Sequence, residues 1–514
     1  MNTKNNQLSL LDSILNKVEI AGNKLPDPVT IFSLLIIVLM LISVMTDGVS
    51  VINPANGETV IAVSLLSQEN LTKFLSEMVS KFQNFPPLGM VLMVMLGAGV
   101  AEKTHLLDMA MKASVVKVPS KYITFVLVFI ALLADGAGDS GYLILPPLAA
   151  IIFLTIGRNP LIGMFAAYAC VSGGFVADLI VNMTDVLIVG FTIPAAQLID
   201  KTYQASPAIN WYFNIASMLV ITFSGVFVTE KIIGPRLDKS MTLKNDQLHA
   251  TEITPLEKKG LRWAGMTVLL LVLLTGALCI GPNAFMKDPA SGSLLAWESP
   301  LMQGLVPIIS VMFLVPGIVY GCITKSIKND KDVVKLMGSS MADMGGYIVI
   351  ALVAALFLAL FTWSNIGIVT SVLGANWIKS MGFDNIGIIF IMIIFCCFIS
   401  IFITSASAKW AILAPVFVPM FMLLGYDPSL TQLAFRISDA ATSAVTPLFV
   451  FFPMLLTFAK QYKSDIGMGT VIANMLPYGF VFLIAYILLL VIFIVFNIPL
   501  GPGSPILYHG IPHP

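Results

Sequence analysis

The sequence predicts an all-α polytopic membrane protein with about nine transmembrane helices, two re-entrant hairpins and an inverted repeat. Three observations support this class: the composition, the length of the apolar runs, and a pattern of irregular apolar segments that occurs twice. Of the 514 residues, 57% are hydrophobic and 11% are charged, and the mean hydropathy is +0.92. Soluble chains carry roughly 25% charged residues, so this composition excludes a soluble globular fold. Lys plus Arg and Asp plus Glu number 28 each, which leaves no net positive charge to bind nucleic acid.

Nine apolar runs are long enough to cross a bilayer, which takes about 20 residues. They lie at 29–46, 85–101, 121–136, 210–229, 262–281, 302–321, 345–363, 385–404 and 469–497. Two further apolar blocks, 139–200 and 405–458, contain Gly, Pro, Ser, Asp and Asn, which is typical of discontinuous segments. Ahead of the first run, apolar residues at helical spacing over 8–22 predict an N-terminal interfacial segment within 1–28.

The distribution of Lys and Arg predicts the orientation. The basic segments 102–121, 230–262 and 325–335 should be cytoplasmic, and the loops 47–84 and 282–301 should face outward. Tracing the spans then places the N-terminus in the cytoplasm and the C-terminus outside.

A shift of 268 residues aligns the two irregular blocks without a gap. Across 142–166, seven aligned pairs are identical, among them Gly157 with Gly425 and Pro160 with Pro428, where about two are expected by chance. The predicted orientations of the two halves are opposite, and inverted repeats with broken helices are typical of secondary transporters. The first repeat then covers 29–235, with an irregular part at 135–200, and the second repeat covers 262–500, with an irregular part at 385–458. An interfacial segment (1–28) precedes them, a cytoplasmic linker (236–261) joins them, and a tail (501–514) follows.

The irregular blocks contain polar and charged residues that are costly inside a membrane, at roughly 2.5–3.5 kcal/mol for a central charge. In the first block, Asp178 and Asp185 would share one face if the segment is helical, and either is a candidate proton or sodium carboxylate. In the second block, Arg436 and Asp439 stand three apart. They can form an intrahelical pair, or Arg436 can bind a substrate carboxylate while Asp439 positions it or changes protonation.

Small or polar residues at 405–409 precede Trp410 and suit a re-entrant turn. Trp410 could stack on an aromatic substrate and Ser407 could donate a hydroxyl, although a tryptophan of the interfacial belt is the alternative. Asp135 and Asp139 flank glycines at the other turn, where capping of a half-helix is as plausible as transport.

Three separated motifs resemble the AbgT family of p-aminobenzoyl-glutamate transporters: Ser172–Phe175 with Thr184 and Asp185, Ser405–Trp410, and Arg436–Asp439 with Pro447. The resemblance implies a homodimer in a bacterial inner membrane, with each protomer divided into a scaffold and a transport core. It further implies import of p-aminobenzoyl-glutamate or export of sulfonamide antimetabolites, driven by an ion gradient. The site residues that we expect, with Asn182 added from the first block, are Asn182, Asp185, Ser407, Trp410, Pro428, Arg436, Asp439 and Pro447. The chain departs from the family pattern at Asp178, where Asn is usual, and at Val186, where Pro is usual.

We therefore expect a secondary transporter of aromatic carboxylates within the lipid bilayer, without a metal or organic cofactor, coupled to H+ or Na+. A dicarboxylate carrier and a passive channel are the alternatives within transport. An intramembrane aspartyl protease is a remote alternative, because Gly136–Asp139 matches its G-x-G-D motif and Tyr426–Asp427 supplies a Tyr-Asp pair. The two motifs stand in the reverse order here, which disfavours an enzyme.

Overall fold

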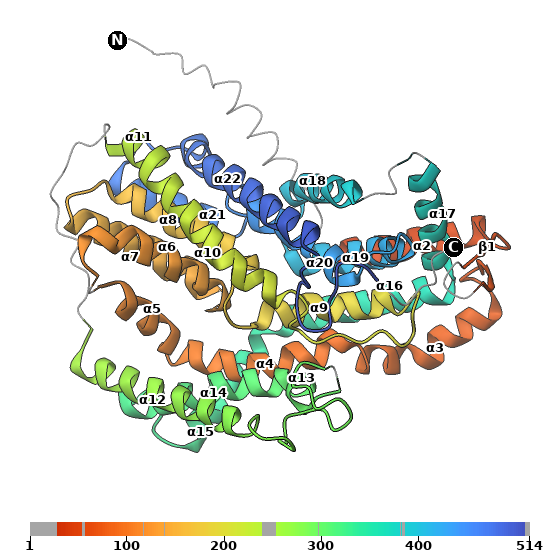
Figure 1. The fold of residues 1–514 in the computed structure, drawn as a ribbon, viewed down its shortest axis with the longest axis horizontal. Helices are drawn as coiled ribbons and strands as arrows, with labels where there is room; N and C mark the ends of the chain where they lie inside the picture. Colours follow the sequence, from red (N-terminus) through yellow and green to blue (C-terminus); the bar gives the residue numbers. More distant parts are fainter. Residues whose placement is uncertain are drawn as a thin grey trace, which may run out of the picture.

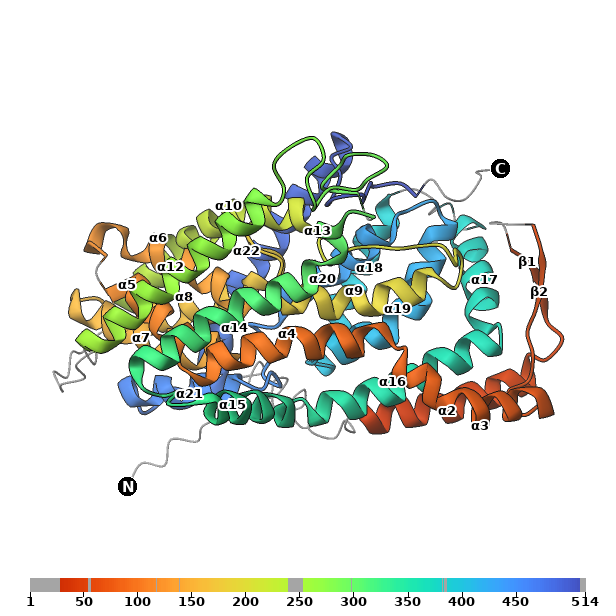
Figure 2. The same cartoon turned by 90° about the horizontal axis from the view of Figure 1, so that it is seen from below.

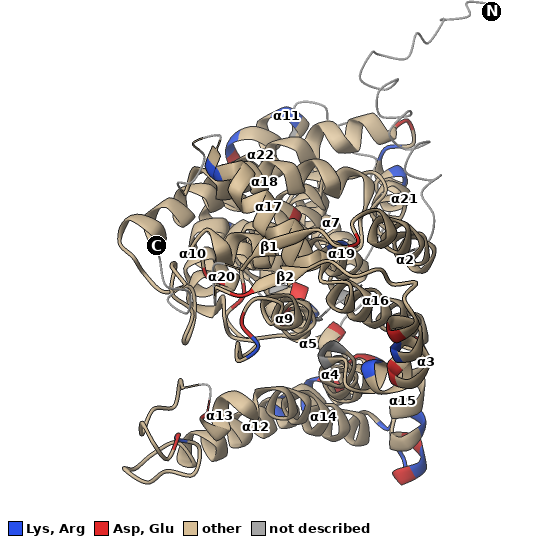
Figure 3. Ribbon diagram, turned by 90° about the vertical axis from the view of Figure 1, so that its right-hand side faces the viewer, with Lys and Arg blue, Asp and Glu red and all other residues tan. Residues whose placement is uncertain are grey.

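The computed structural model describes residues 28–53, 57–116, 118–137, 139–238, 253–296, 298–380, 382 and 386–508. Most helices in this part of the chain run along the long axis of the molecule (Figure 1, Figure 2). Acidic and basic residues are sparse along the ribbon, as expected for helices surrounded by lipid (Figure 3). The predicted interfacial segment at 8–22, much of the predicted linker and the end of the tail lie outside the described residues.

The N-terminal part contains four helices and an antiparallel β-hairpin: α2 (Pro28–Met45), β1 (Ser50–Ile52), β2 (Thr59–Ile61), α3 (Gln68–Gln83), α4 (Pro86–Lys103) and α5 (Leu106–Val116). The following part contains short turns between longer helices: η1 (Ser120–Tyr122), α6 (Ile123–Leu133), η2 (Ala134–Ala137), α7 (Asp139–Thr155), α8 (Pro160–Gly173), η3 (Gly174–Val176), α9 (Met183–Ala196), α10 (Trp211–Phe227), the π-helical η4 (Val228–Ile233) and α11 (Gly234–Asp238).

The second half contains the following helices: α12 (Pro255–Ala277), α13 (Pro300–Gln303), α14 (Leu305–Thr324), α15 (Asp330–Asp343), α16 (Gly345–Trp363), α17 (Ile366–Ser380), α18 (Gly387–Phe402), α19 (Ala406–Leu423), α20 (Pro428–Thr442), α21 (Phe452–Tyr462) and α22 (Met468–Val495). Helix α9 packs against both α4 and α19, and α20 packs against α18 and α22. The two irregular blocks of the sequence therefore meet in the middle of the fold.

Each of the nine predicted spans contains a helix, which confirms the all-α membrane class. Seven helices within the described residues are long and apolar enough to cross a membrane; six of them lie at predicted spans, and the seventh is α19, within the second irregular block. The helices at the other three predicted spans, α2, α6 and α18, are not among the seven, and α6 and α18 have only 11 and 16 residues. The count of nine spans and the re-entrant hairpins therefore stay predictions.

The block 405–458, expected to be discontinuous, contains two regular helices, α19 and α20, before its break. Helix α19 is continuous over 18 residues although Pro415 and Pro419 lie inside it. Neighbouring helices cover it, and such packing lets a buried helix tolerate the lost backbone hydrogen bonds. The genuine breaks are at 174–182, between α8 and α9, and at 443–451, between α20 and α21.

The helix boundaries follow the shift found in the sequence. Pro160 and Pro428 each begin a helix, α8 and α20, and the start residues of α7 and α19 and of α9 and α21 also agree with the shift of 268 to within one residue. Both breaks then fall at equivalent places. This agreement supports the predicted duplication, whereas the opposite orientation of the repeats stays a prediction.

Two parts of the structure contain more helix than the apolar runs alone indicated. Helix α12 begins at Pro255, ahead of the apolar run at 262, because Thr254 and Glu257 form a capping box there. The predicted outward loop 47–84 contains the β-hairpin and the 16-residue helix α3. Helix α3 is amphipathic, and its low overall hydropathy concealed it among loop residues.

Candidate functional site

Arg436 of α20 links the second repeat to the break in the first. Its side chain is fully buried and donates a hydrogen bond to the Asp185 carboxylate. Its Nε donates to the Phe175 carbonyl oxygen at 3.1 Å, and the guanidinium lies 5.1 Å from the centre of the Phe175 ring. A buried guanidinium needs several acceptors, and here the backbone of the short 3-10 helix η3 supplies one and a carboxylate another.

Asp185 is held at the start of α9 by a capping box with Asn182. The Asn182 side chain accepts hydrogen bonds from the backbone N–H groups of Thr184 and Asp185, and the Asp185 carboxylate accepts from the Asn182 N–H at 2.9 Å. The Asn182 amide also donates to the Asp178 carboxylate at 2.8 Å. Asp178 and Asp185 do not share a helical face as predicted, because 177–182 is not helical; Asn182 connects them instead.

Gly174 allows the break to approach the end of α6. A Cβ atom at this position would lie 2.2 Å from the Leu132 carbonyl oxygen and 2.7 Å from the Asp135 Cβ atom. No side chain fits in that space, so the chain needs glycine where it leaves α8. The Asp135 side chain has a buried Oδ2 that accepts no hydrogen bond, so this oxygen does not cap a helix; the Asp139 side chain lies outside the described part.

A second buried ion pair joins Asp439 of α20 to Lys409 of α19. The Lys409 ammonium donates to the Asp439 carboxylate and to the Ser400 hydroxyl, the latter at 2.6 Å. Of the two alternatives for Arg436 and Asp439, the intrahelical pair is therefore wrong, because each residue has its partner on another element. Lys409 was missing from the predicted site, although a lysine within an apolar run signals a buried partner.

Trp410 lies inside the protein and not at the membrane interface. It is 0% exposed, it stacks on Phe435 with the ring centres 4.6 Å apart, and its Nε1 donates to the Thr192 hydroxyl at 2.9 Å. The interfacial-belt alternative was therefore wrong. A ring buried in this way offers no open face for stacking in this conformation.

The indole hydrogen bond continues into a chain of polar contacts between the repeats. The Thr192 hydroxyl donates to the Gln432 side-chain oxygen at 2.6 Å, and the Gln432 amide donates to Asn210 at 2.8 Å. Sequence reasoning missed these residues, because isolated Thr, Gln and Asn side chains give no periodic signal.

The other predicted site residues lie apart from this network. Ser407 is partly exposed in the first turn of α19 and shares a hydrogen bond with Ser405 at 3.3 Å. Pro447 is buried in the break after α20. Pro428 begins α20, eight residues or about 12 Å along the helix from Arg436. Asp427, from the protease alternative, accepts a hydrogen bond from the Ser429 N–H and caps α20.

Comparison with known proteins identifies the family. A sequence profile of the AbgT transporter family matches residues 13–508. The chain is 38% identical over 488 residues to the p-aminobenzoyl-glutamate transport protein of Escherichia coli K12, and the match covers 95% of each chain.

Two solved structures share the fold over nearly the whole chain. The YdaH transporter of Alcanivorax borkumensis is 35% identical, with a TM-score of 0.89 over 93% of this chain and 100% of that one. MtrF of Neisseria gonorrhoeae, described as representing a class of antimetabolite efflux pumps, is 41% identical, with a TM-score of 0.88 over 96% and 100%. These relatives are transporters and not enzymes, which overturns the protease alternative. The chain is therefore a multi-pass membrane transporter and belongs to the AbgT family.

Proposed function

We propose that this transporter moves p-aminobenzoyl-glutamate, or closely related aromatic carboxylates, across the bacterial cytoplasmic membrane and couples the movement to a proton or sodium gradient. The observation that carries the proposal is the charge composition of the buried centre. Three buried carboxylates, Asp178, Asp185 and Asp439, lie in the same part of the fold as two buried cations, Arg436 and Lys409, and a fourth carboxylate, Asp135, lies beside Gly174 with one oxygen buried. When all six are ionised, two negative charges are in excess, and uptake of protons or Na+ neutralises them.

The pairing of Arg436 with Asp185 supplies a physical route to coupling. A substrate carboxylate can bind the guanidinium in bidentate fashion only if Asp185 gives up its hydrogen bond. Protonation of Asp185, or binding of Na+ to it, weakens its hold on Arg436 and so favours the substrate. The cation and the anionic substrate then bind together, and a membrane potential contributes about 2.3 kcal/mol per charge per 100 mV.

Uptake into proteoliposomes tests the proposal. Purified protein is reconstituted, a pH or sodium gradient is imposed, and uptake of labelled p-aminobenzoyl-glutamate is followed for the wild type, Arg436→Met and Asp185→Asn. We expect gradient-dependent uptake by the wild type only. Arg262→Met, at an exposed position on α12, is the matched control and should transport normally. Absence of wild-type uptake under both gradients, with folded protein, would overturn the proposal.

Export of antimetabolites is a second candidate, supported by the likeness to MtrF. The same proteoliposomes distinguish the two candidates, because an exporter accumulates labelled sulfonamide when the gradient is applied in the opposite sense. A protein that carries sulfonamide and not p-aminobenzoyl-glutamate is an efflux pump.

The orientation and the assembly are part of this proposal. We place the N-terminus in the cytoplasm and the C-terminus outside, supported by the lysines at the C-terminal end of α4 and at the start of α12. We also propose a homodimer, supported by the family membership. Light scattering of the detergent-solubilised protein tests the dimer, and labelling of Lys258 in intact cells tests the orientation.

A further inference from the structure

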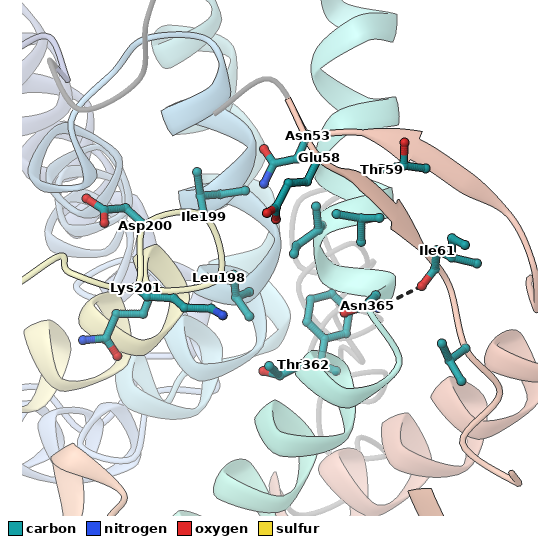
Figure 4. Close-up of a pocket in the computed structure, with 15 residues that line it drawn as sticks. Asn53, Glu58, Thr59, Ile61, Leu198, Ile199, Asp200, Lys201, Thr362 and Asn365 are labelled. Atoms are coloured by element: carbon teal, nitrogen blue, oxygen red, sulfur yellow. Dashed lines mark hydrogen bonds between the residues drawn. The ribbon is translucent and has the colours of Figure 1, made fainter. Parts of the chain in front are cut away.

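Two cavities adjoin at the C-terminal end of α9, away from the buried centre. The larger has a volume of about 890 Å³ and lies between the β-hairpin, the residues after α9 and the α16–α17 corner (Figure 4). The smaller, of about 340 Å³, lies between α3, α9 and α16. Gln197, Leu198, Lys201 and Thr362 line both, so the two spaces are neighbours.

The cavities are connected to the buried centre through one helix. Asp185 lies in the first turn of α9, and Gln197 follows its last turn. Twelve residues of α-helix separate them, which corresponds to about 18 Å. Neither cavity is lined by Arg436 or Asp439, so these spaces are distinct from the ion-paired centre. They lie on the side of the molecule that we predict to face outward.

The smaller cavity has the chemistry of an anion site with an aromatic wall. Lys81 and Lys201 line it, and none of the described residues in its lining is acidic. Phe85 and Trp363 contribute aromatic rings, and the Lys81 ammonium lies 5.9 Å from the centre of the Trp363 ring. Lys81 also faces Glu77 at 3.6 Å, but both side chains are about two-fifths exposed, and such a surface pair contributes little. Lys81 can therefore bind an external anion at little cost.

The larger cavity has mixed charge and is a poorer anion site. Glu58 and Asp200 line it together with Lys201, whose side chain extends from the loop after α9 into the space facing α16 and α17 (Figure 4). Burial opposes ionisation of Asp200, but hydrogen bonds donated by Thr202 and Tyr508 outweigh it and hold the pKa of this carboxyl below its usual range. An anion that enters the larger space is therefore repelled from its acidic side and directed toward the smaller one.

We propose that the smaller cavity is an outer capture site for an aromatic carboxylate, which binds there before it reaches the buried centre. The carboxylate lies between Lys81 and Lys201, and the ring packs against Phe85 and Trp363. Two exposed lysines also raise the local concentration of anions and speed their encounter with the protein. The identity of the ligand class rests on the proposed function, whereas the cavity and its charges do not.

Protection of an introduced cysteine tests the capture site directly. Thr362 is exposed and lines both cavities, so Thr362→Cys should react with a polar maleimide. The reaction at position 362 is followed by peptide mass spectrometry in lipid nanodiscs, with and without p-aminobenzoyl-glutamate. At about ten times the Kd of the ligand, mass action predicts about tenfold slower labelling. Thr72→Cys, at an exposed polar position on α3 that lines neither cavity, is the control and should react at an unchanged rate.

Lysine variants establish the chemistry of the site. Lys81→Ala and Lys201→Ala should each weaken the protection about threefold to fivefold, which corresponds to the loss of one partly exposed ionic contact. Lys201→Glu should abolish it. Lys73→Ala is the matched control, since Lys73 lies on the same helix, pairs with Glu69 and does not line either cavity. Protection that is equal in all four lysine variants would overturn the proposal.

The experiment separates this inference from the proposed function. Arg436→Met disables the buried centre, and protection of Thr362→Cys should persist in that background. Intact transport by the wild type with no protection at position 362 refutes the capture site alone. Protection at position 362 without gradient-driven transport supports the capture site and refutes the proposed function.

Discussion

Arg436 of α20 and Asp185 of α9 form a buried ion pair across 251 residues of sequence. The pair joins the first break, between α8 and α9, to the helix that precedes the second break. Because Arg436 also donates to the Phe175 carbonyl, one side chain holds both the carboxylate and the backbone of η3 in the opposite repeat. Any movement that separates the repeats must therefore break or replace these contacts.

Removal of one member of this pair should destabilise the protein strongly. Arg436→Met leaves the Asp185 carboxylate buried without its partner, and such a change costs about 3–5 kcal/mol. The double variant Arg436→Met with Asp185→Asn should recover much of that loss and still fail to transport. Thermal unfolding of the purified protein in detergent measures the stability, and Arg262→Met should unfold like the wild type.

The partners of the two buried cations can be distinguished by compensation. Lys409→Met should be rescued in stability by Asp439→Asn, because the structure pairs these residues. Arg436→Met should not be rescued by Asp439→Asn, since the structure pairs Arg436 with Asp185. If Asp439→Asn rescued the Arg436 variant and not the Lys409 variant, Arg436 and Asp439 would be partners within α20, contrary to the structure. Lys379→Met, at an exposed position on α17, serves as the charge-matched control.

Substitutions at Trp410 should separate packing from hydrogen bonding. Trp410→Phe keeps a ring against Phe435 and loses the hydrogen bond to Thr192, so a loss of about 1 kcal/mol is expected. Trp410→Ala empties the site and should cost about 3–5 kcal/mol. Trp377→Ala, at a 64% exposed position, should leave the stability unchanged. If Trp410→Phe transports normally, the role of the indole is structural. If Trp410→Phe has a normal melting temperature but a greatly reduced affinity for the substrate, the indole takes part in substrate binding.

Gly174→Ala should impair folding or transport by steric conflict. The added methyl group would lie 2.2 Å from the Leu132 carbonyl oxygen, and the backbone there must move to accept it. We expect lower yield and a lower melting temperature. Gly265→Ala on α12, where nothing lies within 4 Å of the added atom, is the matched control and should be neutral. A fully stable and active Gly174→Ala protein would contradict the close approach of α6 to the break.

Tyr508→Phe should produce a small loss of stability that depends on pH. The Tyr508 hydroxyl donates to Asp200 and helps to keep the pKa of that carboxyl below its usual range. A carboxyl with a lowered pKa stabilises the folded state above its unfolded value of about 3.9, and the contribution disappears as the pH falls through the folded value. At pH 7 the free energy of unfolding of the variant should therefore be lower than that of the wild type by about 1 kcal/mol or less. This difference should vanish toward pH 3. A difference that grows as the pH falls would contradict the assigned contact.

The sequence by itself determined the membrane class, the nine apolar runs at which helices form, and the shift that relates the two irregular blocks. These properties depend on composition and on local runs, because a bilayer demands about 20 apolar residues whatever the partners of a helix are. It also identified most of the charged residues of the buried centre, since an ionisable group in an apolar run is costly and therefore conspicuous.

Only the tertiary structure decided which of these groups are partners. Spacing along one helix suggested Arg436 with Asp439, but the folded chain pairs Arg436 with Asp185 and Asp439 with Lys409. It also placed Trp410 against Phe435 and formed the cavity between Lys81 and Lys201. Ion pairs and cavities depend on distances between elements far apart in the chain, and those distances are set by helix packing, which local sequence patterns do not encode.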